Sequence, residues 1–272
     1  MLVRDSGYTL FVGIDEYDAP ANNTVFDGSG PENQSQRSNK VVAIETLFKG
    51  VLFSGLKQHY GSCISKYFLT GMLPAFQSGM SPLTATTMVS GSPKLHGICG
   101  LTDQQVELLA KNFLTMDDSN PALGQICWAM KKYYNGYYFA KPSDIELELR
   151  YNPQLVYNYL EATKTGGQVS EPEESQAVHT TNILASISDN GPFSVADIVE
   201  LMAVGHVPFR FRSEFEFYDL GGNLGTDRDT ILSLLVYLGV LTRDVTTGHF
   251  RIPNGIMKQN VVTCPHQSID FY

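Results

Sequence analysis

The chain has 272 residues, 43% of them hydrophobic, which is enough for one large domain or two smaller ones with buried cores. Its net charge of −9 argues against a general nucleic-acid-binding surface, because such a surface needs a basic face. No apolar run approaches the ~18 residues of a membrane-spanning helix, and the N-terminus lacks the basic and apolar regions of a secretory signal. We therefore expect an intracellular protein, cytoplasmic or nuclear.

The four cysteines are far apart in the sequence: Cys63, Cys99, Cys127 and Cys264. They form no C-x-x-C pair. This pattern predicts reduced thiols rather than a zinc site or a disulfide framework.

The segment from Tyr8 to Asp18 joins an apolar run to a cluster of carboxylates. The run predicts a buried strand, and the acids come where ligands of α/β sheets bind, at the strand's carboxyl end. An apolar strand followed by Asp15 and Glu16 is the Walker B pattern of P-loop nucleoside triphosphatases, in which the Asp holds magnesium and the Glu polarises water. A strand end with solvated acids looks the same, so this segment alone leaves both interpretations open.

A second strand is predicted after one helix. Residues 19–40 are expected to form a loop, and residues 41–60 a helix with one apolar face. The strand Ile64–Gly71 then completes a βαβ unit with parallel strands, and it brings Thr70 to the same carboxyl edge as Asp15 and Glu16. The Thr70 hydroxyl could bind a phosphate or the attacking water, or could simply close the strand. The apolar helix face comprises Val41, Ile44, Leu47, Phe48, Val51, Leu52 and Leu56.

The middle of the chain predicts three helices with clear start signals. Thr102 and Gln105 form a capping box for a helix to about Leu114. Asn120-Pro121 opens a second helix to about Tyr133, and Asn152-Pro153 opens a third through Leu160. Between the last two, Asn135-Gly136 predicts a tight hairpin flanked by aromatic residues.

The C-terminal part follows a polar stretch, 163–180, that is a plausible domain boundary. Ser194 is expected to cap a helix through Met202, and 209–218 alternates aromatic and charged residues as a half-exposed strand does. A compact apolar helix, 230–241, then precedes a hairpin, 242–252, around Thr247-Gly248. Helices followed by a small hairpin resemble a winged-helix module.

With these pieces in order, the chain resembles the predicted AAA-ATPase-like family of bacteria and fungi. Its members usually carry a P-loop domain followed by a restriction-endonuclease-like nuclease domain. The resemblance implies an α/β fold, with an incomplete P-loop (AAA/STAND-like) core and helical lid in residues 1–165, a mainly helical, winged-helix-like region in 166–258 and a tail in 259–272. The matching segments are spread in order over most of the chain, at 14–20, 67–71, 97–102, 133–139, 151–153, 237–242 and 252–254.

The resemblance also implies residue roles. Asp15 would hold Mg²⁺ through water, Glu16 would position the attacking water, and Thr70 would be the polar sensor on the adjacent strand. Asp18 and Asn135 are assigned to cofactor binding, with Asn135-Gly136 standing where the family has an Asp-Gly turn. The implied cofactors are ATP and Mg²⁺.

Two departures from the family bear on activity. The phosphate-binding loop G-x-x-x-x-G-K-[ST] should precede the Asp-Glu strand, but only seven residues precede Tyr8, and no segment matches the nuclease domain. Losing one well-placed donor at an anionic site costs roughly 3 kcal/mol, so losing the whole loop should abolish useful hydrolysis. We therefore expect an ATPase-like protein that is inactive as this chain. The alternative is a non-enzymatic interaction or regulatory module with a protein partner at an exposed sheet edge; nucleic acid is not an expected partner.

Overall fold

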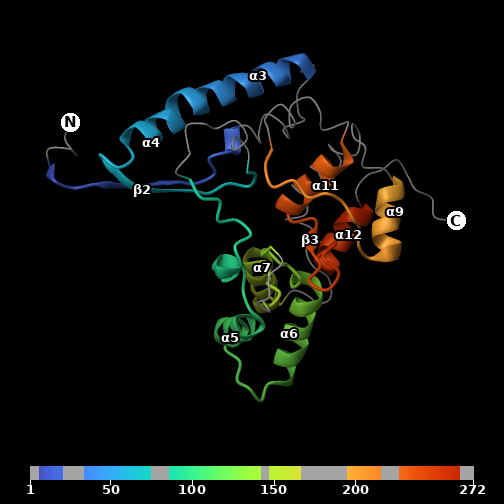
Figure 1. Cartoon of the computed structure of the whole chain (residues 1–272). Helices are drawn as coiled ribbons and strands as arrows, with labels where there is room; N and C mark the ends of the chain where they lie inside the picture. The colour runs from blue at the N-terminus through green and yellow to red at the C-terminus, as the bar shows by residue number, and fades with distance from the viewer. Residues whose placement is uncertain are drawn as a thin grey trace. The chain divides into compact units, whose positions relative to one another are not determined.

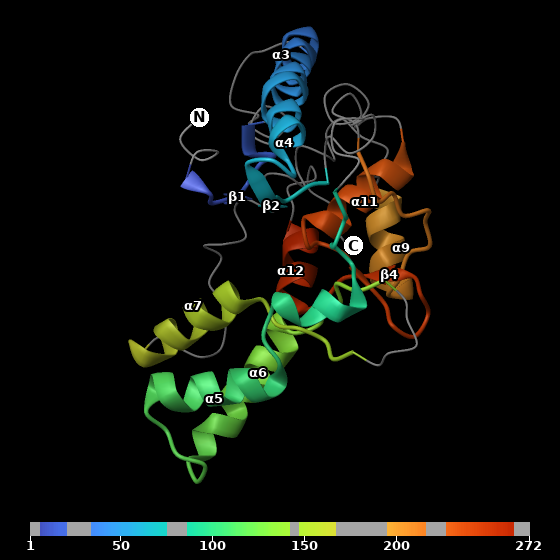
Figure 2. The same cartoon turned by 60° about the vertical axis from the view of Figure 1, so that its left-hand side comes forward.

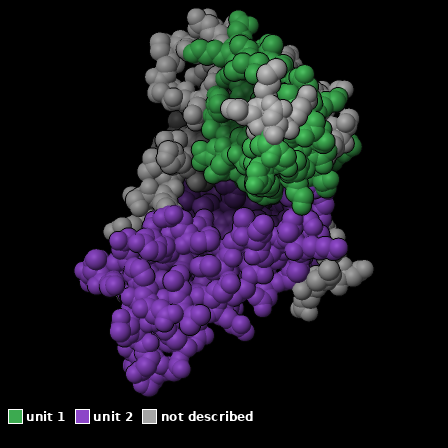
Figure 3. All heavy atoms as spheres, turned by 90° about the vertical axis from the view of Figure 1, so that its left-hand side faces the viewer, with its two compact units in different colours: residues 1–87, 189–192, 210–237 green, residues 88–188, 193–209, 238–272 purple. Residues whose placement is uncertain are grey.

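The computed structural model describes residues 6–20, 34–74, 86–141, 147–166, 195–215 and 227–263. The chain forms two compact units, coloured separately in Figure 3. The first comprises 1–87, 189–192 and 210–237, and the second comprises 88–188, 193–209 and 238–272. The predicted boundaries at 165/166 and 258/259 stay predictions; in this division 210–237 groups with the N-terminal strands, and 238–272 groups with the helices of the second unit.

The first unit is built on two parallel strands. β1 (Leu10–Ile14) pairs with β2 (Ile64–Leu69), and Ile14 lies opposite Leu69. The connection is helical: α3 (Gln34–Leu47), a π-helical segment η1 (Phe48–Phe53) and α4 (Ser54–His59) form one continuous rod (Figure 1). The predicted parallel βαβ unit is confirmed. The helix begins at Gln34, so the predicted loop is wrong for residues 34–40.

The π-helical segment changes which helix face is buried. Val41, Phe53 and Leu56 are buried, whereas Leu47 and Val51, both predicted on the apolar face, are 59% and 65% exposed. A π-helical turn closes i→i+5 hydrogen bonds and so holds more residues than an α-helical turn. The positions after Phe48 are therefore rotated, and Phe53 enters the core in place of Val51. The predicted face is therefore wrong at Val51 because of η1, and wrong also at Leu47, which lies before η1; its other members are buried or half-buried.

The segment 210–237 adds one buried helix to the first unit. In α11 (Arg228–Tyr237), Ile231, Leu232, Leu234 and Leu235 are all fully buried. Of the predicted strand 209–218, residues 209–214 are irregular, Phe215 forms an isolated bridge, and 216–218 lie outside the described residues; the rings of Phe211 and Phe215 pack on Tyr237 of α11. The predicted strand is therefore wrong for the described residues 209–214.

The second unit has a helical core. α5 (Asp103–Leu114), α6 (Pro121–Tyr134) and α7 (Pro153–Lys164) pack together and are seen side by side in Figure 2. The Thr102–Gln105 capping box is present, and Asn120 and Asn152 cap the other two helices. These three helix starts are confirmed. The buried core comprises Val106, Ala110, Leu123, Ile126, Ala129, Met130, Tyr134, Tyr151, Val156, Tyr159, Leu160 and Ile256.

The predicted tight hairpin at Asn135-Gly136 is wrong. α6 continues to Tyr134, Asn135 ends it, and the next residues are extended, with Tyr137 bridged to Arg150. Gly136 is needed for another reason: it has φ +120°, and a Cβ there would lie 1.9 Å from the Pro253 carbonyl oxygen. The Asn-Gly pair therefore marks a close approach of two backbone segments.

The remaining elements of the second unit are a short 3₁₀ helix, η3 (Pro93–Ile98), two helices and a hairpin. α9 is Val195–Val204, and α12 is Gly255–Thr263. β3 (Thr242–Arg243) and β4 (Phe250–Arg251) pair antiparallel, which confirms the predicted hairpin. Ser194, the predicted cap of α9, lies outside the described residues, and the winged-helix organisation stays a prediction.

Two expectations concern the chain as a whole. Cys63, Cys99 and Cys127 are free cysteines, while Cys264 lies outside the described residues. Over the described ranges, none of the helices has the length and apolarity to cross a membrane.

Candidate functional site

The two parallel strands end side by side and bring two polar side chains together. The backbone N–H of Thr70 donates to the carbonyl of Ile14 at 2.9 Å, so the residues just beyond β1 and β2 are neighbours. There the Thr70 hydroxyl donates to Asp15 Oδ1, and the backbone N–H of Glu16 donates to the same oxygen at 3.0 Å. The predicted meeting of Asp15 and Thr70 is confirmed. We call Asp15, Glu16 and Thr70 the carboxyl edge.

Glu16 has an unusual backbone at this edge. Its φ is +49°, in the left-handed region that few residues other than glycine adopt. The side chain is exposed, and within the described part of the chain no hydrogen bond or ion pair engages its carboxylate. Strained backbone of this kind is concentrated at functional sites, and an exposed acid can bind water. Both properties suit the predicted water-positioning role, although an ordinary solvated acid at a strand end would also be exposed.

Asp18 has a different environment from its neighbours. It is only 1% exposed, its Oδ1 accepts the N–H of Met72 at 3.1 Å, and its Oδ2 accepts the N–H of Leu73 at 2.6 Å. Two backbone donors stabilise the buried carboxylate. Because both oxygens are used inside the protein, this geometry favours a structural role for Asp18 over the predicted contact with a cofactor.

Tyr17 also holds residues 70–73, the loop that follows β2. Its N–H donates to the Thr70 carbonyl at 3.0 Å, and its hydroxyl donates to the Leu73 carbonyl at 2.8 Å. Burial raises the pKa of Tyr17 above its ordinary value, with the nearby Asp18 charge adding to the effect, so the hydroxyl stays a donor. Tyr17 and Asp18 together hold residues 70–73 and so fix Thr70 against Asp15. The sequence alone did not predict this role of Tyr17. The residue that could have indicated it is Gly71, the glycine that follows the strand.

The carboxyl edge fits magnesium better than it fits a triphosphate. A carboxylate beside a hydroxyl offers the oxygen donors that Mg²⁺ prefers, and this ion usually keeps several waters and binds one or two carboxylates plus phosphate oxygens. The described residues hold no group of three or more His, Cys, Asp or Glu side chains arranged for a metal, which a mostly hydrated Mg²⁺ does not require. The sequence supplies no Gly-rich loop with Lys for the phosphates.

Asn135 belongs to the second unit and is bonded within it. It is buried at the end of α6, where its side-chain oxygen accepts the N–H of Gly136 at 2.6 Å and its amide donates to Asp103 at 3.4 Å. Asp103 also binds Lys131 at 2.7 Å and accepts from the Tyr151 hydroxyl. These contacts tie the start of α5 to the end of α6, so the geometry gives Asn135 a structural role rather than the predicted cofactor contact.

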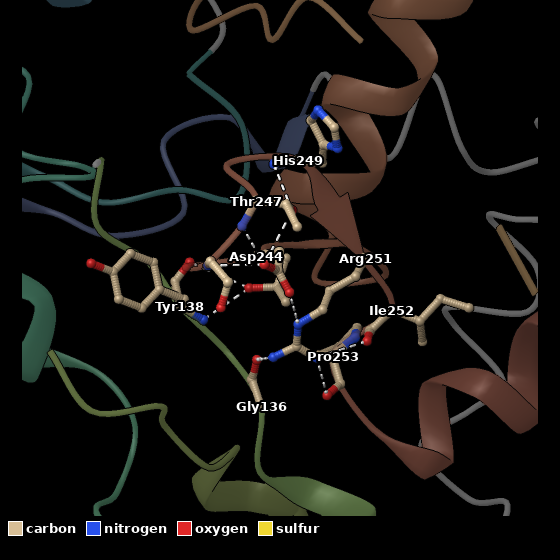
Figure 4. A network of polar contacts seen from close by, with 10 residues as sticks. Gly136, Tyr138, Asp244, Thr247, His249, Arg251, Ile252 and Pro253 are labelled. Carbon is tan, nitrogen blue, oxygen red and sulfur yellow. Dashed lines mark hydrogen bonds and ion pairs between the residues drawn. The ribbon is translucent and has the colours of Figure 1, made fainter. Parts of the chain in front are cut away.

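The second unit contains one further polar network, centred on Arg251 of the hairpin (Figure 4). Its guanidinium donates to the carbonyls of Gly136 at 3.2 Å and Pro253 at 3.1 Å, and pairs with Asp244 at 3.2 Å. Thr242 exchanges two hydrogen bonds with the backbone of Tyr138. Because the arginine is already bound to a carboxylate and to carbonyls, the network joins the hairpin to residues 136–138 and is not an open anion site.

Comparison with known proteins identifies no relative: the chain matches no protein-family model, no curated protein and no solved structure. Its function has to be argued from its own residues.

Proposed function

We propose that this chain is an AAA-ATPase-like protein whose first unit retains the magnesium-binding edge of a nucleotide site, and that the chain does not hydrolyse ATP on its own. The observation that supports the proposal is the hydrogen bond from Thr70 to Asp15 at the carboxyl ends of neighbouring parallel strands. Ligands of parallel sheets bind at this end, and Glu16 is exposed beside the pair.

Each residue of the carboxyl edge has a distinct role in this proposal. Asp15 would hold a hydrated Mg²⁺, Thr70 would orient the Asp15 carboxylate, and Glu16 would accept a hydrogen bond from water. Bound magnesium would neutralise phosphate charge. Without a loop of backbone donors and a lysine, a triphosphate loses several contacts, each worth roughly 3 kcal/mol at comparable sites. Nucleotide binding should therefore be weak and hydrolysis undetectable.

The test is a titration of the ¹⁵N-labelled protein with MgCl₂ and then with Mg-ATP, followed by NMR. We expect amide shifts at residues 15–16 and 70–72, with millimolar affinity for both ligands. Asp15→Asn should abolish these shifts, because it removes the charge that attracts the ion. Glu161→Gln, which neutralises an exposed acid of α7, is the matched control and should leave them unchanged.

Two outcomes would contradict the proposal. Wild-type protein whose carboxyl-edge amides do not respond to magnesium would refute the metal-binding role. Micromolar binding of Mg-ATP, or ATP hydrolysis that Asp15→Ala abolishes, would refute the inactivity.

A second candidate function is that of a non-enzymatic interaction module, and the exposure of the two-stranded sheet favours it. Phe11 and Phe68 are 66% and 46% exposed, and no third strand flanks β1 or β2 in the described ranges. Small parallel sheets are normally covered on both faces. A module of this kind would keep its interaction in an Asp15→Asn, Glu16→Gln double variant and lose it in Phe11→Lys.

A further inference from the structure

The side of β1 that faces away from β2 carries backbone groups that have no hydrogen-bond partner among the described residues. The N–H of Leu10 donates to Cys63 at 2.8 Å and the carbonyl of Ile14 accepts from Thr70 at 2.9 Å, so these residues point their polar groups toward β2. Because these directions alternate along a strand, Phe11 and Gly13 point theirs to the opposite side, which we call the outer edge. In the part of the chain that the structure describes, no strand pairs there.

The outer edge lacks two of the usual devices that prevent strand pairing, namely charged residues and proline. Exposed edges are commonly protected by charged residues or proline, and unprotected ones pair with other strands. Residues 8–14, YTLFVGI, contain neither a charge nor a proline. This neutral segment lies in a chain of net charge −9, so it is a place where two copies could approach without opposing like charges.

One face of the sheet, the open face, has a shape that fits a second copy. Phe11 pairs with Lys66 and Gly13 with Phe68, and all four are exposed. Gly13 leaves a gap without a side chain next to Phe68. Apart from its chain neighbours, the described residue that comes within 4 Å of the position of a Gly13 Cβ is Phe11, whose ring lies 3.7 Å from it. An aromatic ring across from a strand glycine covers its exposed backbone.

We propose that the occupant of the outer edge is the β1 strand of a second copy of this chain, paired antiparallel so that Phe11 of each copy lies opposite Gly13 of the other. Val12 then lies on the twofold axis, and the outward backbone groups of Phe11 and Gly13 form the hydrogen-bonded pairs. The sheet becomes four-stranded, in the order β2, β1, β1, β2. Across the open face each Gly13 lies between Phe68 of its own copy and Phe11 of the other.

This proposal develops the interaction-module function and makes no use of the magnesium site. It is therefore tested without metal or nucleotide, by sedimentation equilibrium of the full chain over a wide concentration range. We expect a monomer–dimer equilibrium that Phe11→Lys weakens by at least about tenfold, since the change removes two symmetric cross-strand contacts. The control Val51→Lys puts the same charge on a helix position of equal exposure (65% against 66%) and should change the dissociation constant by less than about twofold.

Disulfide formation tests the register. Hydrogen-bonded antiparallel pairs have Cα atoms about 5.5 Å apart, within the range that a disulfide spans. Phe11→Cys and Gly13→Cys proteins should therefore cross-link when mixed and not when oxidised separately, above the background of wild type. A wild type that stays monomeric, equal weakening by Phe11→Lys and Val51→Lys, or a mixture that cross-links no more than each cysteine variant does alone, would overturn the proposal. A monomer would leave the strand of a different protein as the alternative occupant.

Discussion

Asp18 and Gly71 are in contact so close that no side chain fits between them. A Cβ on Gly71 would lie 2.3 Å from Asp18 Oδ1 and 2.8 Å from the Tyr17 ring. The Asp18 carboxylate is held by two backbone N–H groups and cannot move away without losing them. We expect Gly71→Ala to lower the free energy of unfolding by about 2–3 kcal/mol through overpacking, as measured by urea denaturation.

The control for this prediction is Gly55→Ala in α4. Among the described residues, no atom beyond its chain neighbours and its own helix backbone lies within 4 Å of the position of its Cβ, and alanine favours helix over glycine by about 0.5–1 kcal/mol. Gly55→Ala should therefore be neutral or stabilising. Equal destabilisation by both changes would show that the contact with Asp18 is not what excludes a side chain at Gly71.

A second prediction concerns the attachment of the hairpin in the second unit. The buried Thr242 hydroxyl accepts the N–H of Tyr138 at 2.8 Å and donates to its carbonyl at 3.3 Å. Thr242→Val keeps the shape but leaves both backbone groups without their partner, and an unsatisfied buried polar group costs about 1–3 kcal/mol. We expect a loss of that size in chemical denaturation. Thr242→Ser keeps the hydroxyl and should lose less; a valine variant as stable as wild type would be inconsistent with this role.

A third prediction tests the role of Thr70, as distinct from that of Asp15, in the proposed magnesium site. Thr70→Val removes the hydroxyl that orients the Asp15 carboxylate, while Thr70→Ser preserves it. We expect the valine variant to bind Mg²⁺ more weakly by NMR titration and the serine variant to match wild type. Since the hydrogen bond is solvent-exposed, stability should change by no more than about 1 kcal/mol in either variant. Unchanged magnesium affinity in the valine variant would remove Thr70 from the site.

The structure is predicted best from the sequence where one local signal determines where an element begins or how it pairs. Proline and asparagine before α6 and α7, and the Thr102–Gln105 box before α5, determine helix starts almost alone. The apolar runs of β1 and β2, separated by one helix, similarly require parallel pairing. The meeting of Asp15 with Thr70 follows directly, because both residues come just after their strands.

The structure is predicted poorly from the sequence where a segment distant in the chain determines the conformation or orientation of a residue. Gly136 looks like a turn residue, but its conformation is required by Pro253, more than a hundred positions later. Asp18 looks like a third acid of the carboxyl edge, but the N–H groups of Met72 and Leu73 turn it inward. The sequence contains no signal for the shift of the buried helix face at η1, because its residues are equally consistent with a regular α-helical period.

His96 connects two backbone segments through its ring. Its Nε2 lies 2.6 Å from the Glu148 carbonyl and must donate to it, so Nδ1 is the acceptor for the N–H of Phe139 at 3.3 Å. Tyr137 and Arg150 pair directly as antiparallel partners, and Phe139 and Glu148 would be the next pair. The imidazole thus replaces one ladder hydrogen bond, and it can do so only in the neutral state, because a protonated Nδ1 cannot accept.

The last prediction is that His96 makes stability depend on pH. Burial lowers the pKa of His96 from its ordinary 6.5, and the Arg150 charge lowers it further, against the opposing effect of the bond to Glu148. The unfolded chain therefore takes up the proton at a higher pH than the folded chain. The stabilisation is complete above about pH 6.5 and is lost as the pH falls toward the folded pKa. His96→Gln can donate and accept without titrating, so thermal unfolding of this variant should lose less stability than wild type between pH 7 and pH 5. Parallel pH profiles for the two proteins would show that His96 does not contribute this dependence.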